Sequence, residues 1–447
     1  MLKVGMTRVD ITPPLGLKLH GYPHYPRNNE GHHDPLYSAC MYLENNGTEV
    51  AMITLDLLYF AKRFVMQVRS RAAELCGIDG KNIMISCSHT HSGPRCFEEL
   101  DNPEETTGNE QGNTETAYVE WLIEALAKQV AEAKAKAREG YFGIGTAMCG
   151  AESGVGGNRR VRGGPHDPLV SVMAVKDAND TLLGALVNYT LHPTFIHEWS
   201  NVCTADYPAY LKMEIEEKYP TMVTGFAQGC SGNQSSRYYR NGESYDEAER
   251  VGRAIGAAAN EAIAKMEWKN DVALKVAIST MDIEIRSFGT EEELEAQVAH
   301  DRAIYEDLYG RYGKSTNRDE YYLWQNANLK LLGSENQLNY VKRLNATGII
   351  PRFKEESPAE LQVITFDNAC VVGFPGEAFV EYGLYIKAVA GFSPVVVNEC
   401  TNGCLPGYMY TPESLLTGGY ETDTSVLSPT FGRKLVSRVL ETVDTLK

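Results

Sequence analysis

The chain has 447 residues, of which 43% are hydrophobic and 23% are charged, and its formal net charge is −17. This balance is typical of a globular protein with a large core, and the acidic charge disfavours a general nucleic-acid binder or a protein that docks on anionic membranes. We therefore expect a small-molecule substrate as the partner, with neither nucleic acid nor a stable membrane association.

The amino-terminal segment and the cysteines bear on the cellular compartment. The opening residues, MLKVGMTRVDITPPLG, contain no basic leader followed by an apolar core. No apolar run approaches the roughly 18 residues that a membrane span needs. The ten cysteines are scattered, and a long chain without an export signal favours reduced thiols. Together these features predict a cytoplasmic protein.

Short apolar runs rich in β-branched residues alternate with segments of helical periodicity, which indicates an α/β protein with a mixed β-sheet core flanked by helices. Several runs are apolar on consecutive positions, as expected for strands covered on both faces. The predicted strands are Val50–Leu58, Asn82–Ser88, Leu169–Val175, Leu183–Leu191, Met222–Ala227, Leu361–Phe366, Ala369–Phe374 and Pro394–Asn398. The predicted helices are Thr116–Arg138, Tyr245–Met266 and Glu291–Tyr309.

The segment 290–344 is charged, rich in tyrosine and helical in its pattern. We interpret it as a helical excursion from the main domain that forms a lid or an oligomer surface, so a homo-oligomer is compatible with the sequence. There is neither an internal repeat nor a low-complexity linker. We therefore predict one catalytic domain over residues 1–447.

Three candidate metal ligands each come directly after a predicted strand: His89, His192 and Glu377. Open α/β sheets bind ligands in the crevice beyond the carboxyl ends of their strands, so these side chains can converge there. Two imidazoles and a carboxylate are a common catalytic zinc set that leaves a fourth position open. Taken singly, each residue is better explained as a structural histidine or as a carboxylate at a helix start, and it is their repeated placement at strand ends that favours a metal site.

Several short motifs recur in one order along most of the chain. They are GMTRVDITP at 5–13, GHHDPLY at 31–37, SHTHSGP at 88–94, Asn158-Arg159, LHPT at 191–194, Asp206-Tyr207-Pro208, FAQGCSGNQSS at 226–236, FPGE at 374–377 and YMYTPESLLTGGYE at 408–421. In this order and spacing the sequence resembles the catalytic domain of the neutral/alkaline ceramidase family, and more closely its short relatives. The resemblance implies a zinc-dependent hydrolase of an amide or ester bond without the family's carboxyl-terminal immunoglobulin-like domain.

The resemblance assigns roles to individual residues. The zinc ligands it implies are His89, His192, Glu377 and Tyr408, the last chosen over Tyr410 because of its interval to Tyr420. His91 corresponds to the general acid/base, and in an extended segment it would share a face with His89. Ser235 occupies the position of the family's motif serine, and Arg159 corresponds to the arginine that positions the substrate. Tyr420 would supply a phenol that stabilises the developing oxyanion.

The sequence also departs from the family pattern near the implied site. Asn233 stands where the family has Asp, which removes a charge, and Ser414-Leu415 replace a Glu-Tyr pair in the tail. Both changes weaken the case for ceramide itself more than the case for zinc chemistry. Asn233 remains a candidate substrate-binding residue.

Arginines gather in the loops that carry these motifs. They are Arg95, Arg159, Arg160, Arg162, Arg237 and Arg240. Guanidinium groups bind carboxylates and phosphates in a bidentate manner, so a small, soluble, anionic substrate is one interpretation. The other is that these arginines pair with Asp and Glu on neighbouring loops.

Three other functions compete with an amidase. One is hydrolysis or elimination on a carboxylated carbohydrate by the same scaffold, and another is a binding protein without catalysis. The third is a serine hydrolase with Ser235 as nucleophile, although no Gly-x-Ser-x-Gly elbow surrounds it.

Overall fold

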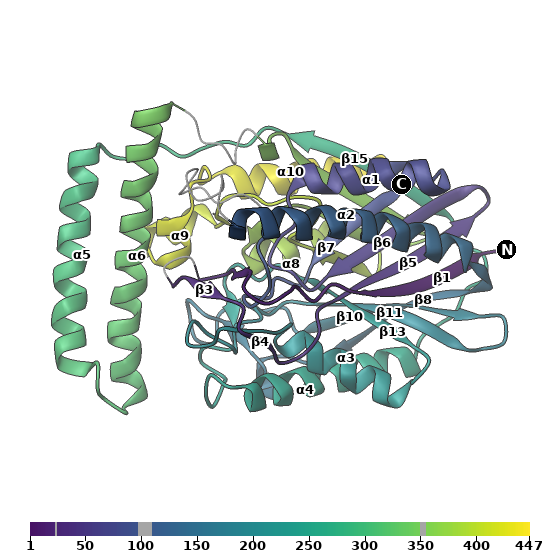
Figure 1. Ribbon diagram of the computed structural model, residues 1–447, viewed down its shortest axis with the longest axis horizontal. Coiled ribbons are helices and arrows are strands. Elements are labelled where there is room, and N and C mark those ends of the chain that lie inside the picture. The colour runs from purple at the N-terminus through teal and green to yellow at the C-terminus, as the bar shows by residue number, and fades with distance from the viewer. Residues whose placement is uncertain (23–24, 97–109, 349–354) are drawn as a thin grey trace.

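The computed structural model describes residues 1–22, 25–96, 110–348 and 355–447, with side chains from residue 115 onward in the third range. Its largest element is an eight-stranded sheet of order β13-β11-β10-β8-β1-β5-β6-β7 (Figure 1). Most neighbouring pairs are antiparallel, whereas β6 pairs with β7 and β11 with β13 in parallel. The strands are β1 (Lys3–Asp10), β5 (Tyr37–Asn45), β6 (Thr48–Leu55), β7 (Ile83–Cys87), β8 (Arg138–Met148), β10 (Leu169–Asp177), β11 (Leu182–Tyr189) and β13 (Val223–Gln228).

A second, four-stranded sheet packs against the first. Its order is β15-β16-β17-β19, with strands β15 (Leu274–Met281), β16 (Ala359–Phe366), β17 (Ala369–Gly373) and β19 (Val395–Asn398). Because strand side chains alternate between faces, Met41 and Met52 of the large sheet meet Ile364 and Val371 of the small sheet in one buried cluster. The two sheets therefore form the two inner layers of the molecule.

Helices cover the outer face of each sheet. The large sheet is covered by α1 (Lys62–Cys76), α2 (Glu110–Ala135), α3 (Tyr207–Lys218) and α4 (Tyr245–Ala264), which share its main apolar cluster. The small sheet is covered by α8 (Val380–Val389) and α10 (Phe431–Asp444). The predicted mixed α/β core flanked by helices is confirmed, and it consists of two sheets stacked between helical layers.

Two long helices project from one end of this core (Figure 1). They are α5 (Glu291–Tyr312) and α6 (Arg318–Thr347), the predicted helical excursion. Thr290 and Glu293 form a reciprocal capping box at the start of α5, and Asn317 caps α6. α5 packs on α6, and α6 packs on the short helix α9 (Tyr420–Thr424), which carries site residues.

The other strands are two-residue pairings in the loops around the site. They are β2 (Lys18–Leu19), β3 (Arg27–Asn28), β4 (Gly31–His32), β9 (Gly157–Asn158), β12 (Val202–Cys203), β14 (Gln234–Ser235), β18 (Glu377–Ala378) and β20 (Tyr408–Met409). Among the described residues, no helix has both the length and the apolarity that crossing a membrane requires.

Candidate metal centre and adjoining cavity

The three predicted strand-end ligands come together. His89 follows β7, His192 follows β11 and Glu377 follows β17. The ends of β7 and β13 in the large sheet are tied to the residues that follow β19 in the small sheet, by backbone hydrogen bonds from Cys87 N to the Cys400 carbonyl at 3.0 Å and from Glu399 N to the Gln228 carbonyl at 2.9 Å. The loops beyond both sheets therefore meet at one place.

Two imidazoles converge on one carboxylate oxygen. The Nε2 atom of His192 lies 3.0 Å, and that of His89 3.3 Å, from Oε2 of Glu377. All three atoms are buried and, within the described parts of the chain, have no hydrogen-bond partner outside this mutual contact. Buried polar atoms are normally satisfied, so this arrangement of lone pairs is suited to a cation.

The outer contacts of these ligands hold them in the orientation that a metal needs. His192 Nδ1 donates to the Ser231 carbonyl at 2.8 Å, and His89 Nδ1 donates to the Leu58 carbonyl at 3.2 Å. Because a carbonyl only accepts, each proton lies on Nδ1 and each Nε2 lone pair points to the cluster. The Tyr59 hydroxyl donates to Oε1 of Glu377, which leaves Oε2 for the cation.

The ionisation states also fit a cation. Burial and the nearby Arg159 lower the pKa of His192 from 6.5 to about 4, so this imidazole is neutral at pH 7. Burial opposes ionisation of Glu377, but its contacts with His89 and His192 outweigh burial and hold the pKa of this carboxyl well below its usual range. A neutral imidazole and an ionised carboxylate are the forms that coordinate metals.

His91 lies beside the cluster, as predicted, but for a different geometric reason. Its imidazole has a nitrogen within 4.8 Å of ring nitrogens of His89 and His192. The prediction relied on an extended segment, whereas β7 ends at Cys87 and His89 adopts a left-handed φ of 66°. A tight bend, fixed in part by the hydrogen bond from Thr90 Oγ1 to the Thr204 carbonyl at 2.7 Å, brings the two histidines together.

Tyr408 lies next to Glu377 in the backbone. β18 and β20 pair in parallel with Glu377 opposite Tyr408, and the rings of Tyr408 and Tyr420 contact each other edge-on, 6.0 Å apart. The Arg159 guanidinium lies over the Tyr408 ring, 5.5 Å from its centre. Burial raises the pKa of both phenols, that of Tyr420 to about 12. The role of Tyr408 as a fourth ligand stays a prediction.

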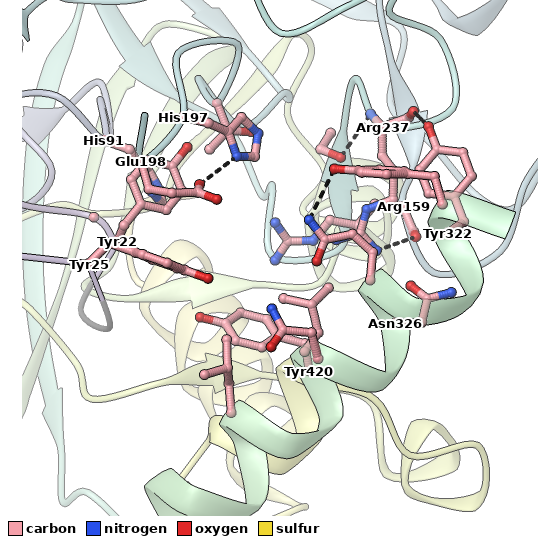
Figure 2. A pocket seen from close by; sticks show the side chains of 18 of the residues that line it. Tyr22, Tyr25, His91, Arg159, His197, Glu198, Arg237, Tyr322, Asn326 and Tyr420 are labelled. Carbon is pink, nitrogen blue, oxygen red and sulfur yellow. Dashed lines mark hydrogen bonds and ion pairs between the residues drawn. The ribbon is translucent and has the colours of Figure 1, made fainter. Parts of the chain in front are cut away.

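A cavity of about 140 Å³ adjoins the cluster. Figure 2 shows His91, His197, Glu198, Tyr22 and Tyr25 on one side and Arg159, Arg237, Tyr322 and Asn326 on the other, with Tyr420 between them. Ser235 and Tyr408 also line it. One wall belongs to α6, so the helical excursion covers the cavity.

The predicted arginines are mostly engaged with carboxylates. Arg159 Nε and Arg160 Nη1 lie 2.7 Å and 2.6 Å from the two oxygens of Glu421, and Arg95 Nη2 lies 2.5 Å from Glu115. Of these three arginines, Arg159 lines the cavity. The finding supports the interpretation that these arginines pair with acidic residues on neighbouring segments.

Asn233 has structural contacts. Its Oδ1 accepts from Val380 N at 2.9 Å, at the start of α8, and its Nδ2 donates to Glu381 at 2.8 Å. Asn233 is not among the described residues that line the cavity. Ser235, by contrast, lines the cavity, and its Oγ accepts a hydrogen bond from Arg237 N at 3.2 Å.

The sequence reasoning missed Tyr59, Tyr22, His197, Tyr322 and Asn326 as site residues. Tyr59 follows the end of β6 closely, the same position relative to a strand that identified the ligands, so this signal could have found it. Tyr322 and Asn326 of α6 have no such sequence signal, because helical periodicity does not show which part of the protein the helix packs against.

The fold and the cluster define an α/β protein with a candidate catalytic metal centre of two histidines and one glutamate. Residues 2–155 match the model of the family described as neutral/alkaline non-lysosomal ceramidase, N-terminal. A curated relative, the neutral ceramidase of Pseudomonas aeruginosa, is 23% identical over 258 residues, which are 52% of this chain and 37% of the relative. The matched region thus spans about a third of that relative.

Solved structures agree with this match. The crystal structure of neutral ceramidase from Pseudomonas aeruginosa superposes with a TM-score of 0.73 at 18% identity, covering all of this chain and 74% of that one. A ceramidase complexed with C2 gives a TM-score of 0.73 at 17% identity and covers 75% of that chain. These matches confirm the resemblance to the neutral/alkaline ceramidase family that the sequence predicted.

Proposed function

We propose that the protein is a metal-dependent hydrolase that cleaves an amide bond, with zinc as the metal. The observation that carries this proposal is the convergence of two histidine Nε2 atoms on Oε2 of Glu377, buried beside a cavity. The similarity to relatives named as neutral ceramidases supports amide chemistry, since ceramide is an N-acylated amine. An ester is the less favoured alternative.

The donor set fits zinc. His89, His192, Glu377 and Tyr408 would hold the ion, and nitrogen and oxygen donors of this kind are common at catalytic zinc sites. A bound zinc ion polarises a carbonyl and lowers the pKa of water in its coordination sphere toward about 7.

His91 is suited to move the proton. Burial and the neighbouring histidines lower its pKa well below 6.5, so the imidazole is neutral at pH 7 and can accept a proton. Both of its ring nitrogens are buried without a hydrogen-bond partner among the described residues, and its ring lines the cavity. His91 can therefore take a proton from water and deliver it to the leaving nitrogen.

Tyr420 and Arg159 are suited to stabilise the negative charge that develops on the carbonyl oxygen of the substrate. Burial raises the pKa of Tyr420 to about 12, so its hydroxyl stays protonated and can donate to an oxyanion. Arg159 is fixed by Glu421 and by the Gly232 carbonyl, at 2.8 Å from its Nη2. A donor that is already held in place loses little freedom when the transition state forms.

A serine nucleophile is less well supported. No histidine or carboxylate in the described parts of the chain hydrogen-bonds to Ser235 Oγ, and an unactivated hydroxyl is a weak nucleophile. We therefore place Ser235 as a substrate-contacting residue of the cavity wall.

The test is metal-dependent amide cleavage. The purified protein is stripped with a chelator, reloaded with zinc, and incubated with a panel of N-acyl compounds whose products are identified by mass spectrometry. We expect cleavage with zinc, none without it, and loss of both zinc and activity in His192→Ala. His300→Ala, on the exposed face of α5, is the matched control. A zinc-loaded protein that cleaves none of the amides, or a metal-free protein at full rate, contradicts the proposal. A parallel incubation with uronic-acid oligosaccharides that gives an unsaturated, ultraviolet-absorbing product would instead establish elimination on a carboxylated carbohydrate.

A further inference from the structure

Three arginine side chains line the cavity, and they differ in their partners. Arg159 pairs with Glu421, and Arg240 pairs with Glu243. Arg237 makes no ion pair with any described residue. Its one guanidinium hydrogen bond to a described residue is from Nη1 to the Arg159 carbonyl, at the long distance of 3.5 Å. The Arg237 guanidinium thus retains most of its donors for another group.

The charges around Arg237 leave a positive excess. Glu421, the acidic residue whose charge acts on Arg237, is already shared by Arg159 and Arg160. Glu198, the acidic residue among the described residues that line the cavity, pairs with His197 at 3.1 Å. Burial lowers the pKa of Arg237, as expected for a guanidinium that has lost water without gaining a carboxylate. A ligand with a negative group would compensate this charge.

The backbone that carries Arg237 is held by α6. The Tyr322 hydroxyl donates to the Arg237 carbonyl, and Arg318 Nη2 donates to the Arg240 carbonyl at 2.6 Å. Figure 2 shows Tyr322 next to Arg237, across the cavity from His91. The guanidinium therefore projects from a fixed base on the wall opposite the proposed acid/base.

The remaining lining offers several hydrogen-bonding groups. It includes the amide side chains of Gln325, Asn326 and Asn328 and the hydroxyls of several tyrosines, and its aliphatic side chains among the described residues are Leu329 and Leu332 on α6. Amides and phenols hydrogen-bond to polar ligands, whereas a long acyl chain gains free energy from an aliphatic lining.

We propose that Arg237 binds an oxyanion of the substrate, so that the preferred amide carries a carboxylate or a phosphate group. This inference rests on the proposed amidase function for the bond that is cleaved, while the anion subsite itself rests on the cavity. Arg237 then determines specificity: it anchors the charged end of the substrate on one wall, and the amide reaches His91 and the metal cluster on the other.

The test compares matched substrates. Short N-acyl amino acids, N-acyl phosphoethanolamine and the corresponding neutral N-acyl amino acid amides are given to the zinc-loaded wild type, Arg237→Gln, Arg237→Lys and Arg162→Gln. Because a hydrogen bond to a charged group changes binding by about 10- to 100-fold, we expect the wild type to favour one anionic class by that factor in kcat/KM. Arg237→Gln should lose this preference, mainly through KM, with unchanged zinc content, and Arg237→Lys should retain part of it.

The control is Arg162→Gln, which removes an exposed guanidinium from a neighbouring loop and should keep the wild-type preference. A preference for carboxylate or for phosphate identifies the natural anion. Equal kcat/KM values for anionic and neutral amides, or a preference that survives in Arg237→Gln, overturn the proposal.

A direct binding measurement separates the two proposals. If the wild type cleaves no amide, calorimetry with acetate and inorganic phosphate still reports on the subsite. Binding that is lost in Arg237→Gln and kept in Arg162→Gln supports the anion subsite although the amidase proposal has failed. Absence of binding in the wild type overturns the subsite as well.

Discussion

The hydroxyl of Tyr59 donates a hydrogen bond to Oε1 of Glu377, and the other oxygen of that carboxylate faces His89 and His192. One side chain outside the candidate ligand set thus fixes which carboxylate oxygen is available to a cation. Such outer contacts commonly change metal affinity by about 10- to 100-fold.

Tyr59→Phe should therefore weaken zinc binding by about 10- to 100-fold without unfolding the protein. The measurement is zinc affinity by competition with a chromophoric chelator, with circular dichroism as the check on folding. Tyr118→Phe removes a buried hydroxyl on α2 that donates to the Ile11 carbonyl and to no candidate ligand, and is the control. Equal zinc affinities for Tyr59→Phe and the wild type would show that the contact does not tune the site.

The variant His91→Gln shows whether His91 acts as a general acid/base or as a metal ligand. His91 has a nitrogen within 4.8 Å of both ligand histidines, so the distance alone is compatible with either role. For an acid/base we expect near-stoichiometric zinc and a kcat reduced by about 10²- to 10⁴-fold. Zinc content by plasma mass spectrometry decides the matter, because loss of the ion in this variant would make His91 a ligand.

The metal-free protein should lose stability as the pH falls from about 6.5 to about 4. The folded-state pKa of His192 is about 4 and its ordinary value is 6.5, so the unfolded chain binds more protons in this range. Each pKa unit corresponds to about 1.4 kcal/mol, so this buried group alone accounts for about 3 kcal/mol. The low pKa of Glu377 has the same sign, since its contribution is lost as pH falls through its folded-state pKa.

Urea unfolding in the presence of a chelator at pH 7, 6, 5 and 4 measures this effect. His192→Gln, which cannot titrate, should show a shallower dependence on pH than the metal-free wild type. Parallel curves for the two proteins would contradict the assignment of the effect to His192.

Gly333→Ala tests whether the contact between α6 and α9 affects the site. A Cβ at this position of α6 would lie 2.6 Å from Cβ of Asp423 in α9, the helix that carries Tyr420. Gly333→Ala should displace α6 and raise KM while leaving zinc content unchanged. Gly310→Ala, on α5, meets open space and should instead stabilise its helix by up to about 1 kcal/mol. Identical KM values for Gly333→Ala and Gly310→Ala would show that the position of α6 does not affect substrate binding.

Most core strands and the candidate ligands were predictable because each has a local signature. All eight predicted strands are present within a few residues of their expected bounds, and all three candidate ligands stand at strand ends. β1, β5 and β15 were missed, and so was β8, because the predicted helix was extended to Arg138 although α2 ends at Ala135. This strand contains Gly143 and Gly145, a composition that disfavours strands in isolation. The glycines are needed because Met266 and Ala262 of the opposing segment approach their backbone too closely for a side chain.

The partners of the arginines were not predictable. Arg159 and Arg160 share Glu421, which lies far along the chain, and only the assembled fold brings α9 to the loop that carries these two arginines. The loop composition indicated a cluster of positive charge correctly but could not tell which guanidinium remains without a carboxylate. That distinction, which separates Arg237 from Arg159, depends on tertiary structure alone.

The cation site joins elements that are otherwise separate. His89 and His192 follow strands of the eight-stranded sheet, whereas Glu377 follows a strand of the four-stranded sheet. An ion held by all three would cross-link the two layers at one end of their shared apolar interface, and its contribution to folding would grow with the free metal concentration. Zinc supply would then govern how long the folded chain survives proteolysis as well as whether it turns over substrate.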